Sequence, residues 1–169
     1  MTGWGLQNLN ALSDLHIGGD DIVNTLLKEQ LLPISLVSLT INHLSKRKSL
    51  PGNGLQHISS LGDLKFKSCS RLKSLPEDML PSSLKSLVFV YCPKLKFLPD
   101  RLPSSLEILE LDDCRRLGSL PKDGLPSSLK RLSISQHRLL KARYKNQRGE
   151  HWSNIAHIPV IKVDNELTI

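Results

Sequence analysis

The stretch Leu84-Lys-Ser-Leu87-Val-Phe89-Val-Tyr-Cys92 carries the pattern that determines the fold. Its first, fourth and sixth residues are apolar, and its ninth is a cysteine. The same apolar pattern begins at three further positions, Leu61, Leu106 and Leu129, so that the starts are 23, 22 and 23 residues apart. Self-similarity at a fixed period of this length is typical of a solenoid, in which one structural unit is stacked per repeat.

The repeat extends in both directions and carries further markers. Upstream copies begin at Leu12 and Leu36, and a looser copy begins at Ile158. A Leu-Pro pair follows each of three starts, with its prolines at Pro76, Pro99 and Pro121. The phrase Leu-Pro-Ser-Ser-Leu then leads into the next unit. The pattern L-x-x-L-x-L-x-x-C with a period of 22 to 25 residues is that of a leucine-rich repeat.

Each unit is predicted to contain one short strand, because apolar and other residues alternate there. Strands of successive units then lie parallel in one sheet, about 4.8 Å apart. The prolines cannot donate to a strand ladder and therefore belong to the return side of the solenoid. We thus predict an α/β repeat fold: a leucine-rich-repeat solenoid, or horseshoe, with a concave parallel β-sheet and an irregular convex side. Its stability comes from stacking of the units.

The sequence predicts two regions. Residues 1–140 form the solenoid, with about six repeats that start near residues 12, 36, 61, 84, 106 and 129. Residues 141–169 form a C-terminal helix and a capping strand. Helix-forming residues follow Leu140 and Gly149 is a stop signal. Trp152, Ile155 and the last strand are expected to cover the apolar end of the final repeat.

Composition narrows the classes of protein. The chain has 169 residues, with 23 Lys and Arg against 16 Asp and Glu, and its net charge of +7 permits an acidic partner. The sequence contains no run of about 18 apolar residues, so we expect no membrane span. The first residues lack the basic and apolar regions of a secretory signal. We therefore expect a cytoplasmic or nucleo-cytoplasmic location.

The cysteines Cys69, Cys92 and Cys114 occur once per repeat, and His137 takes the same position in the fourth copy. Two interpretations stand side by side. The first is a redox or metal-binding role, but no cysteine lies at zinc-ligand spacing from a histidine. The structural role, which we favour, is that of a small buried hydrophobe with a weak S–H donor at the end of the strand. We expect no metal.

Three phrases resemble one known family: Leu-Pro-Ser-Ser-Leu-Lys-x-Leu, Cys-x-x-Leu-x-x-Leu-Pro, and the ending Arg148-Gly-Glu-His-Trp152-Ser-Asn-Ile-Ala-His157-Ile-Pro. They are similar to the C-terminal leucine-rich-repeat region of plant intracellular coiled-coil nucleotide-binding disease resistance proteins. The resemblance implies effector recognition, autoinhibition of a nucleotide switch, and innate immunity. Two departures stand out. Gln136-His137-Arg138 replaces the usual Cys-Pro step, and no P-loop G-x-x-x-x-G-K-[ST] occurs.

The missing P-loop places any ADP or ATP in a nucleotide-binding domain outside this sequence, so we expect no cofactor in this chain. The chain is then a fragment, a truncated product or an excised sensor domain. We also expect no enzyme activity and no catalytic residue. Glu107, Glu110, Asp112 and Asp113 cluster, but on adjacent positions of an exposed strand, where nothing raises a carboxyl pKa. No nucleophile-elbow or zinc-protease motif occurs.

A binding module is favoured, because side chains that point out of the concave sheet are free to vary without harming the core. In order along the sheet these side chains are basic, apolar and aromatic, acidic, then basic. They are Asp63, Lys65, Lys67, Lys85, Val88, Val90, Tyr91, Glu107, Glu110, Asp112, Asp113, Lys130, Arg131, Ser133 and Ser135. Alternating charge sets register and specificity more than affinity. The competing interpretation is an ordinary solvated sheet face.

A second candidate surface is a basic stripe that follows the cysteine position. It comprises Arg71, Lys73, Lys94, Lys96, Arg115, Arg116 and Arg138. It serves either solubility or docking of an acidic surface, such as a neighbouring domain of a parent receptor. The expected partners are proteins: a pathogen effector, a host protein or the nucleotide-binding domain. The alternatives are a bacterial-type leucine-rich-repeat effector domain and a basic nucleic-acid-binding scaffold, whose binding would fall steeply with salt.

Overall fold

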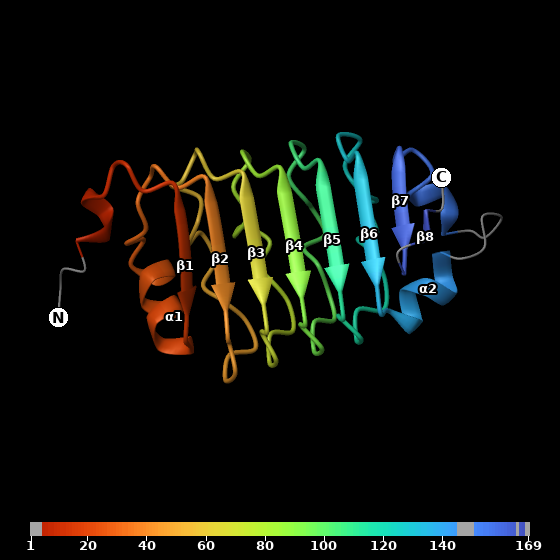
Figure 1. The fold of residues 1–169 in the computed structure, drawn as a ribbon, viewed down its shortest axis with the longest axis horizontal. Coiled ribbons are helices and arrows are strands. Elements are labelled where there is room, and N and C mark those ends of the chain that lie inside the picture. The colour runs from red at the N-terminus through yellow and green to blue at the C-terminus, as the bar shows by residue number, and fades with distance from the viewer. Residues whose placement is uncertain (1–4, 145–150, 165, 168–169) are drawn as a thin grey trace.

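The computed structural model describes residues 5–144, 151–164 and 166–167 and shows one sheet that runs the length of the chain (Figure 1). Seven parallel strands lie side by side in chain order, and an eighth strand pairs antiparallel with the seventh. The strands are β1 (Asp14–Gly18), β2 (Ser38–Asn42), β3 (Asp63–Lys67), β4 (Ser86–Val90), β5 (Ile108–Asp112), β6 (Arg131–Ser135), β7 (Val160–Val163) and β8 (Glu166–Leu167). The predicted parallel repeat solenoid is confirmed.

Register follows directly from the repeat. Leu64 pairs with Leu87, Leu87 with Leu109, and Leu109 with Leu132, so equivalent residues of successive units lie next to one another. The second and fourth residues of strands β2 to β6 are buried, whereas their first, third and fifth residues are partly or fully exposed. This period of two gives the sheet one buried face and one open face. We call the exposed side of strands β3 to β6 the open sheet face.

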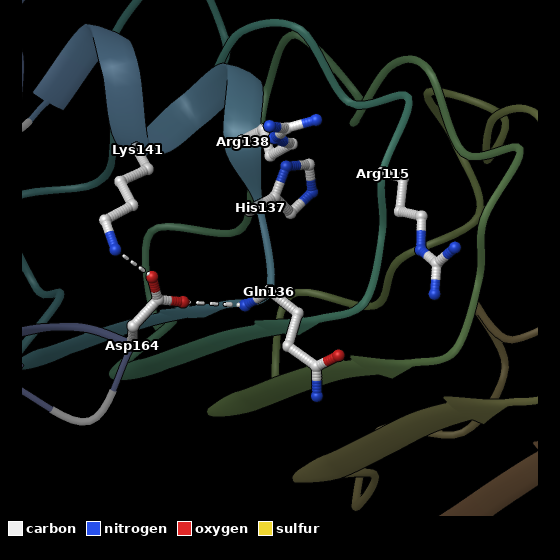
Figure 2. A pocket seen from close by; sticks show the side chains of 6 residues that line it. All are labelled: Arg115, Gln136, His137, Arg138, Lys141 and Asp164. Carbon is white, nitrogen blue, oxygen red and sulfur yellow. Dashed lines mark hydrogen bonds and ion pairs between the residues drawn. The ribbon is translucent and has the colours of Figure 1, made fainter.

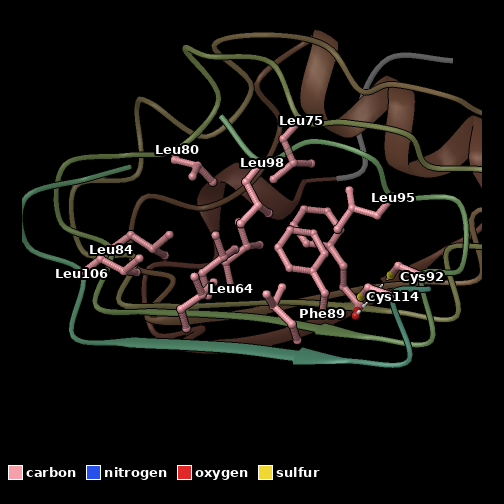
Figure 3. Packing of buried hydrophobic residues seen from close by; sticks show 14 of the residues in the cluster. Leu64, Leu75, Leu80, Leu84, Phe89, Cys92, Leu95, Leu98, Leu106 and Cys114 are labelled. Carbon is pink, nitrogen blue, oxygen red and sulfur yellow. Dashed lines mark hydrogen bonds between the residues drawn. The ribbon is translucent and has the colours of Figure 1, made fainter. Parts of the chain in front are cut away.

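The core lies between the sheet and the return segments of the repeats. It is almost entirely aliphatic, and the leucines of the Leu-Pro pairs, such as Leu75, are buried in it (Figure 3). Phe66 and Phe89 add one aromatic step: their rings stack with centroids 5.1 Å apart. Each unit therefore buries its apolar residues against the next, as expected of a quasi-one-dimensional fold.

Helices lie at the two ends of the solenoid (Figure 1). Helix α1 (Asp20–Lys28) follows β1, and helix α2 (Arg138–Tyr144) follows β6. Two short 3₁₀ helices, η1 (Leu6–Asn8) and η2 (Trp152–Asn154), complete the described elements. Helix α2 begins before the predicted residue 141, and the predicted stop at Gly149 lies outside the described residues. Helix α1 was not predicted, because a strand and return segment were expected at every repeat.

The predicted capping strand is present as β7, which pairs with β6. Ile155 and Ile161 are buried at this end of the core, and Trp152 packs partly buried against it. Strand β8 was not predicted, since a two-residue strand has no periodicity to detect. The described residues contain no helix that is long and apolar enough to cross a membrane.

Strands β2 to β7 end in the same backbone turn. The residue after the last strand position adopts a left-handed conformation, with φ between 49° and 56° at His43, Ser68, Tyr91, Asp113, Gln136 and Asp164. In four of these turns the backbone N–H donates to the carbonyl oxygen of the last strand residue one repeat later, as Tyr91 does to Asp112 at 2.9 Å. The turn therefore continues the ladder while it redirects the chain into the core.

Candidate functional site

The predicted binding residues on strands lie where they were expected, on the open sheet face. Strand β3 presents Lys65, β4 presents Val88, β5 presents Glu110 and β6 presents Ser133, and these four are successive register partners. The other exposed strand residues of the predicted set flank this row. They are Asp63, Lys67, Val90, Asp112, Arg131 and Ser135.

The register brings unlike side chains together on this face. Val88 and Val90 are only partly buried, and they lie between the lysines of β3 and the acidic residues of β5. Neighbouring strands are about 4.8 Å apart, so an apolar strip one strand wide separates a basic strand from an acidic one. A partner that binds here can bury the two valines at the centre of the interface, while the charged strands on either side select a partner of complementary charge.

Three predicted residues lie one position before their strands, at the entry edge of the sheet. These are Lys85, Glu107 and Lys130, and their backbones continue the ladder. Lys130 Nζ lies 2.8 Å from Glu107 Oε2. This hydrogen-bonded lysine holds the pKa of the Glu107 carboxyl below its usual value. A depression of about 480 Å³ runs along this edge, lined in part by Val37, Lys85, Glu107 and Ile108.

Two predicted residues lie in the turns after the strands, not on the open sheet face. The Tyr91 side chain is 49% exposed at the corner that follows β4. Asp113 was placed on an exposed strand, and this is wrong: it is buried in the corner after β5. Its carboxylate accepts hydrogen bonds from Arg115, from Nε at 2.5 Å and from a terminal guanidinium nitrogen at 3.2 Å. Asp113 therefore holds a cation in the turn and is not available to a partner on the sheet.

The three cysteines are buried, free thiols at the ends of the strands. Cys92 Sγ donates weakly to the carbonyl oxygens of Val90 and Phe66, at 3.8 and 3.9 Å. Cys92 and Cys114 lie beside one another in the core (Figure 3). Their mutual hydrogen bonding, together with burial, raises the pKa of Cys92 to about 12. The contact with Cys92 and burial raise the pKa of Cys69 as well. This arrangement supports the structural interpretation.

The predicted basic stripe forms two rows on the edge where the strands end. One row is Lys46, Arg71, Lys94 and Arg116, and the other is Lys48, Lys73 and Lys96. The second row is stacked by backbone hydrogen bonds of 2.8 Å from Lys73 to Lys48 and from Lys96 to Lys73. Lys46 and Lys48 were missed, because their repeat has Leu44 and not cysteine at the marker position. Within the described ranges, none of these seven cations has a carboxylate at salt-bridge distance.

The two remaining members of the stripe, Arg115 and Arg138, belong elsewhere. Both line a pocket at the end of β6, and Arg115 is paired with Asp113. The part of the chain that the structure describes holds no group of three metal-ligating side chains. Our expectations of no metal, no cofactor and no enzyme activity stay predictions.

Two comparisons with known proteins bear on this surface. The family model of the FNIP repeat matches residues 72–114, which include strands β4 and β5. A protein of Arabidopsis thaliana named "Putative disease resistance protein At3g14460" is 33% identical over 82 residues, or 47% of this chain. The chain spans only 6% of that relative's length. The chain thus contains a repeat region similar to part of a plant disease resistance protein, and such repeat modules typically mediate protein interaction.

Proposed function

We propose that this chain is a protein-recognition module that binds its partner on the open sheet face. The observation that carries the proposal is the row Lys65, Val88, Glu110 and Ser133, which holds unlike side chains in fixed register on four rigid strands. Rigid placement lowers the entropy lost on binding. The similarity to a plant disease resistance protein supports a role in innate immunity, with a pathogen effector or a host protein as the partner.

The partner can be found and the surface tested in one experiment. A photo-crosslinking amino acid is placed at Val88, and at exposed Lys122 on the return side as the matched control, and both proteins are irradiated in plant cell extract. The protein captured only from Val88 is then purified and titrated against variants. Tyr91 lies in the turn that borders this face after β4, and its side chain is exposed there. Tyr91→Ala should weaken binding about tenfold, since a tyrosine anchor contributes more than 1 kcal/mol. Charge reversal at Glu110 or Asp112 should mainly slow association and change its salt dependence.

The matched control for the binding surface is the double variant Lys94→Glu, Lys96→Glu, which changes the basic rows and leaves the open sheet face intact. If this variant abolishes binding while Tyr91→Ala and Glu110→Lys do nothing, the proposed surface is wrong. Equal capture from Val88 and from Lys122 would also contradict it, because it would show contact without a preferred face.

A second candidate function rests on the basic rows. Seven cations without carboxylate partners in the described chain suit an acidic surface, such as the nucleotide-binding domain of a longer receptor. The same rows would bind nucleic acid if the chain were a basic scaffold. The salt dependence separates the two cases: binding of a duplex DNA probe that loses several orders of magnitude between low and physiological salt indicates phosphate contacts.

A further inference from the structure

The segment that departs from the repeat, Gln136-His137-Arg138, lines a pocket. The pocket lies where β6 ends and α2 begins, and it has a volume of about 630 Å³. Its lining comes from the turns after β5 and β6, from the first residues of α2 and from the residue after β7. Figure 2 shows the six lining side chains: Arg115, Gln136, His137, Arg138, Lys141 and Asp164.

His137 is the anomaly in this pocket. It takes the position that Cys69, Cys92 and Cys114 fill in the preceding units, and it is only 1% exposed. Neither ring nitrogen has a hydrogen-bond partner among the described residues. Buried polar side-chain atoms nearly always have one. A cysteine tolerates such a site because its thiol bonds weakly, whereas an imidazole needs one strong donor and one strong acceptor satisfied. A ligand in the pocket would supply what the protein does not.

The charge of the pocket defines the class of ligand. Three cationic side chains, Arg115, Arg138 and Lys141, line it against one carboxylate, Asp164. Both oxygens of that carboxylate are already used: the backbone N–H of Gln136 donates to Oδ1 at 2.8 Å, and Lys141 Nζ donates to Oδ2. Asp164 is therefore paired with Lys141, and Asp113, beside the lining, is paired with Arg115. The three cations and these two carboxylates leave a net charge of +1, and Arg138 is the lining cation without a carboxylate partner among the described residues.

The two guanidinium groups are suited to an oxyanion. Arg115 donates two of its five N–H groups to Asp113. These hydrogen bonds fix the plane of the guanidinium group, and its remaining N–H groups can donate to a ligand. Arg138 is exposed, and in Figure 2 its side chain lies beside the imidazole of His137, with Arg115 farther along the pocket. A phosphorylated side chain carries about −1.5 to −2 charges and three strong acceptor oxygens, so it suits a pair of guanidinium groups better than a singly charged carboxylate does.

We propose that this pocket binds the phosphoryl group of a phosphate monoester, held by Arg115 and Arg138 with a hydrogen bond from the ring of His137. The inference rests on the proposed function, since a phosphorylated side chain of a partner protein is the monoester that a recognition module would meet. The pocket is at the carboxyl end of β6, so a partner on the open sheet face can reach it. Recognition would then depend on whether the partner is phosphorylated.

The test is an NMR titration of the full chain that follows the imidazole resonances of His137. The probes are blocked phosphoserine, inorganic phosphate and blocked aspartate. We expect saturable shifts with phosphoserine and with phosphate, and none with aspartate at the same concentration. Shifts with phosphate alone would overturn the proposal, because the pocket would then exclude a monoester. Equal shifts with aspartate would overturn it as well, since the pocket would be a general anion site.

Variants separate the pocket from the rest of the basic surface. His137→Cys, which restores the residue of the other repeats, and Arg138→Gln should each weaken phosphoserine binding about tenfold, the loss expected for one hydrogen bond to a charged group. Arg71→Gln removes a cation of the basic rows and should change nothing. Arg138 is exposed, so its variant keeps the test valid if His137→Cys fails to fold. An equal loss in Arg71→Gln would show non-specific attraction and contradict the proposal.

Failure of this inference can be told apart from failure of the proposed function. Val88→Asn, in the middle of the open sheet face, should reduce partner binding and leave phosphoserine binding unchanged. If phosphoserine does not bind to the pocket but Val88→Asn still weakens binding of the captured partner, only the phosphoryl site is wrong.

Discussion

The hydroxyl of Ser105 donates a hydrogen bond of 2.7 Å to the carbonyl oxygen of Leu84, one repeat earlier in the chain. The contact recurs along the solenoid with distances of 2.6 to 2.8 Å, from Ser35 to Leu12, Ser60 to Leu36, Ser83 to Leu61 and Ser128 to Leu106. These serines form a ladder at the entry to the strands. A serine at this position links neighbouring units through an acceptor in the turn, in addition to the strand hydrogen bonds.

The serine ladder should contribute measurably to stability. Ser105→Ala removes the one O–H donor that the carbonyl oxygens of Leu84 and Ser82 share, and we expect a loss of about 1 kcal/mol in the free energy of unfolding. Ser104→Ala is the matched control: Ser104 is the adjacent, exposed serine, and its change should stay within about 0.5 kcal/mol. Urea denaturation measures both. Equal losses in the free energy of unfolding for the two variants would show that the serine ladder does not stabilise the fold.

The stacked leucines should contribute more than the ladder. Leu109 is fully buried between its register partners Leu87 and Leu132. Leu109→Ala should therefore lower the free energy of unfolding by about 2 to 5 kcal/mol, from lost transfer energy and a residual cavity. Glu110→Ala, the next residue on the open sheet face, should cost less than about 1 kcal/mol. A loss below 1 kcal/mol for Leu109→Ala would contradict the stacking that the structure shows.

The repeat could be read from the sequence because the same constraint acts at every unit. Leu87 and its equivalents must point inward from one strand position, and the spacing of the next unit fixes which residue pairs with it. The exposed residues of the open sheet face followed from the same alternation. The leucine triplet, the cysteine and the Leu-Pro pair each recur at a fixed distance within the repeat. All three support the same strand positions.

The features that sequence reasoning missed do not repeat. Helix α1 replaces a return segment in one unit, although Asp20 and Asp21 at its start and Lys28 at its end match a helix dipole. Asp20 is buried and accepts hydrogen bonds from the backbone N–H groups of residues 45–47, a contact that no local pattern encodes. The burial of Asp113 was missed because the strand ends one residue earlier than its acidic run. The hydrogen bonds of Asp20 and the burial of Asp113 both depend on tertiary contacts.

The buried cysteines should be unreactive until the protein unfolds. The hydrogen bond with Cys114 and burial raise the pKa of Cys92 to about 12, so almost no thiolate is present at pH 8. A thiol-reactive dye should label none of the three cysteines in the native protein and all three in denaturant. Ser127→Cys, which adds a thiol at an exposed position, should label at once and serves as the control. A native disulfide, or one bound zinc ion per chain, would contradict the structural interpretation.

His137 should make the stability of the folded chain depend on pH. Burial lowers the pKa of its imidazole below the usual value of 6.5, and this outweighs the opposing attraction of Asp113 and Asp164. The unfolded chain therefore takes up a proton before the folded chain does. Stability is full above about pH 6.5 and falls as the pH drops toward the folded pKa, with a slope of at most about 1.4 kcal/mol per pH unit.

The measurement is urea denaturation at several pH values between about 7.5 and 5, above the range in which carboxyl groups titrate. His137→Cys should flatten the profile in this window, because the thiol stays neutral throughout. His16→Gln removes an exposed histidine, and this variant should show the same pH profile of stability as the unmodified protein. Asp20, Glu107 and Asp164 have lowered pKa values, so their contributions are lost only at lower pH and do not overlap. A profile in His137→Cys as steep as that of the unmodified chain would show that another group titrates, and that the buried imidazole does not set the pH dependence.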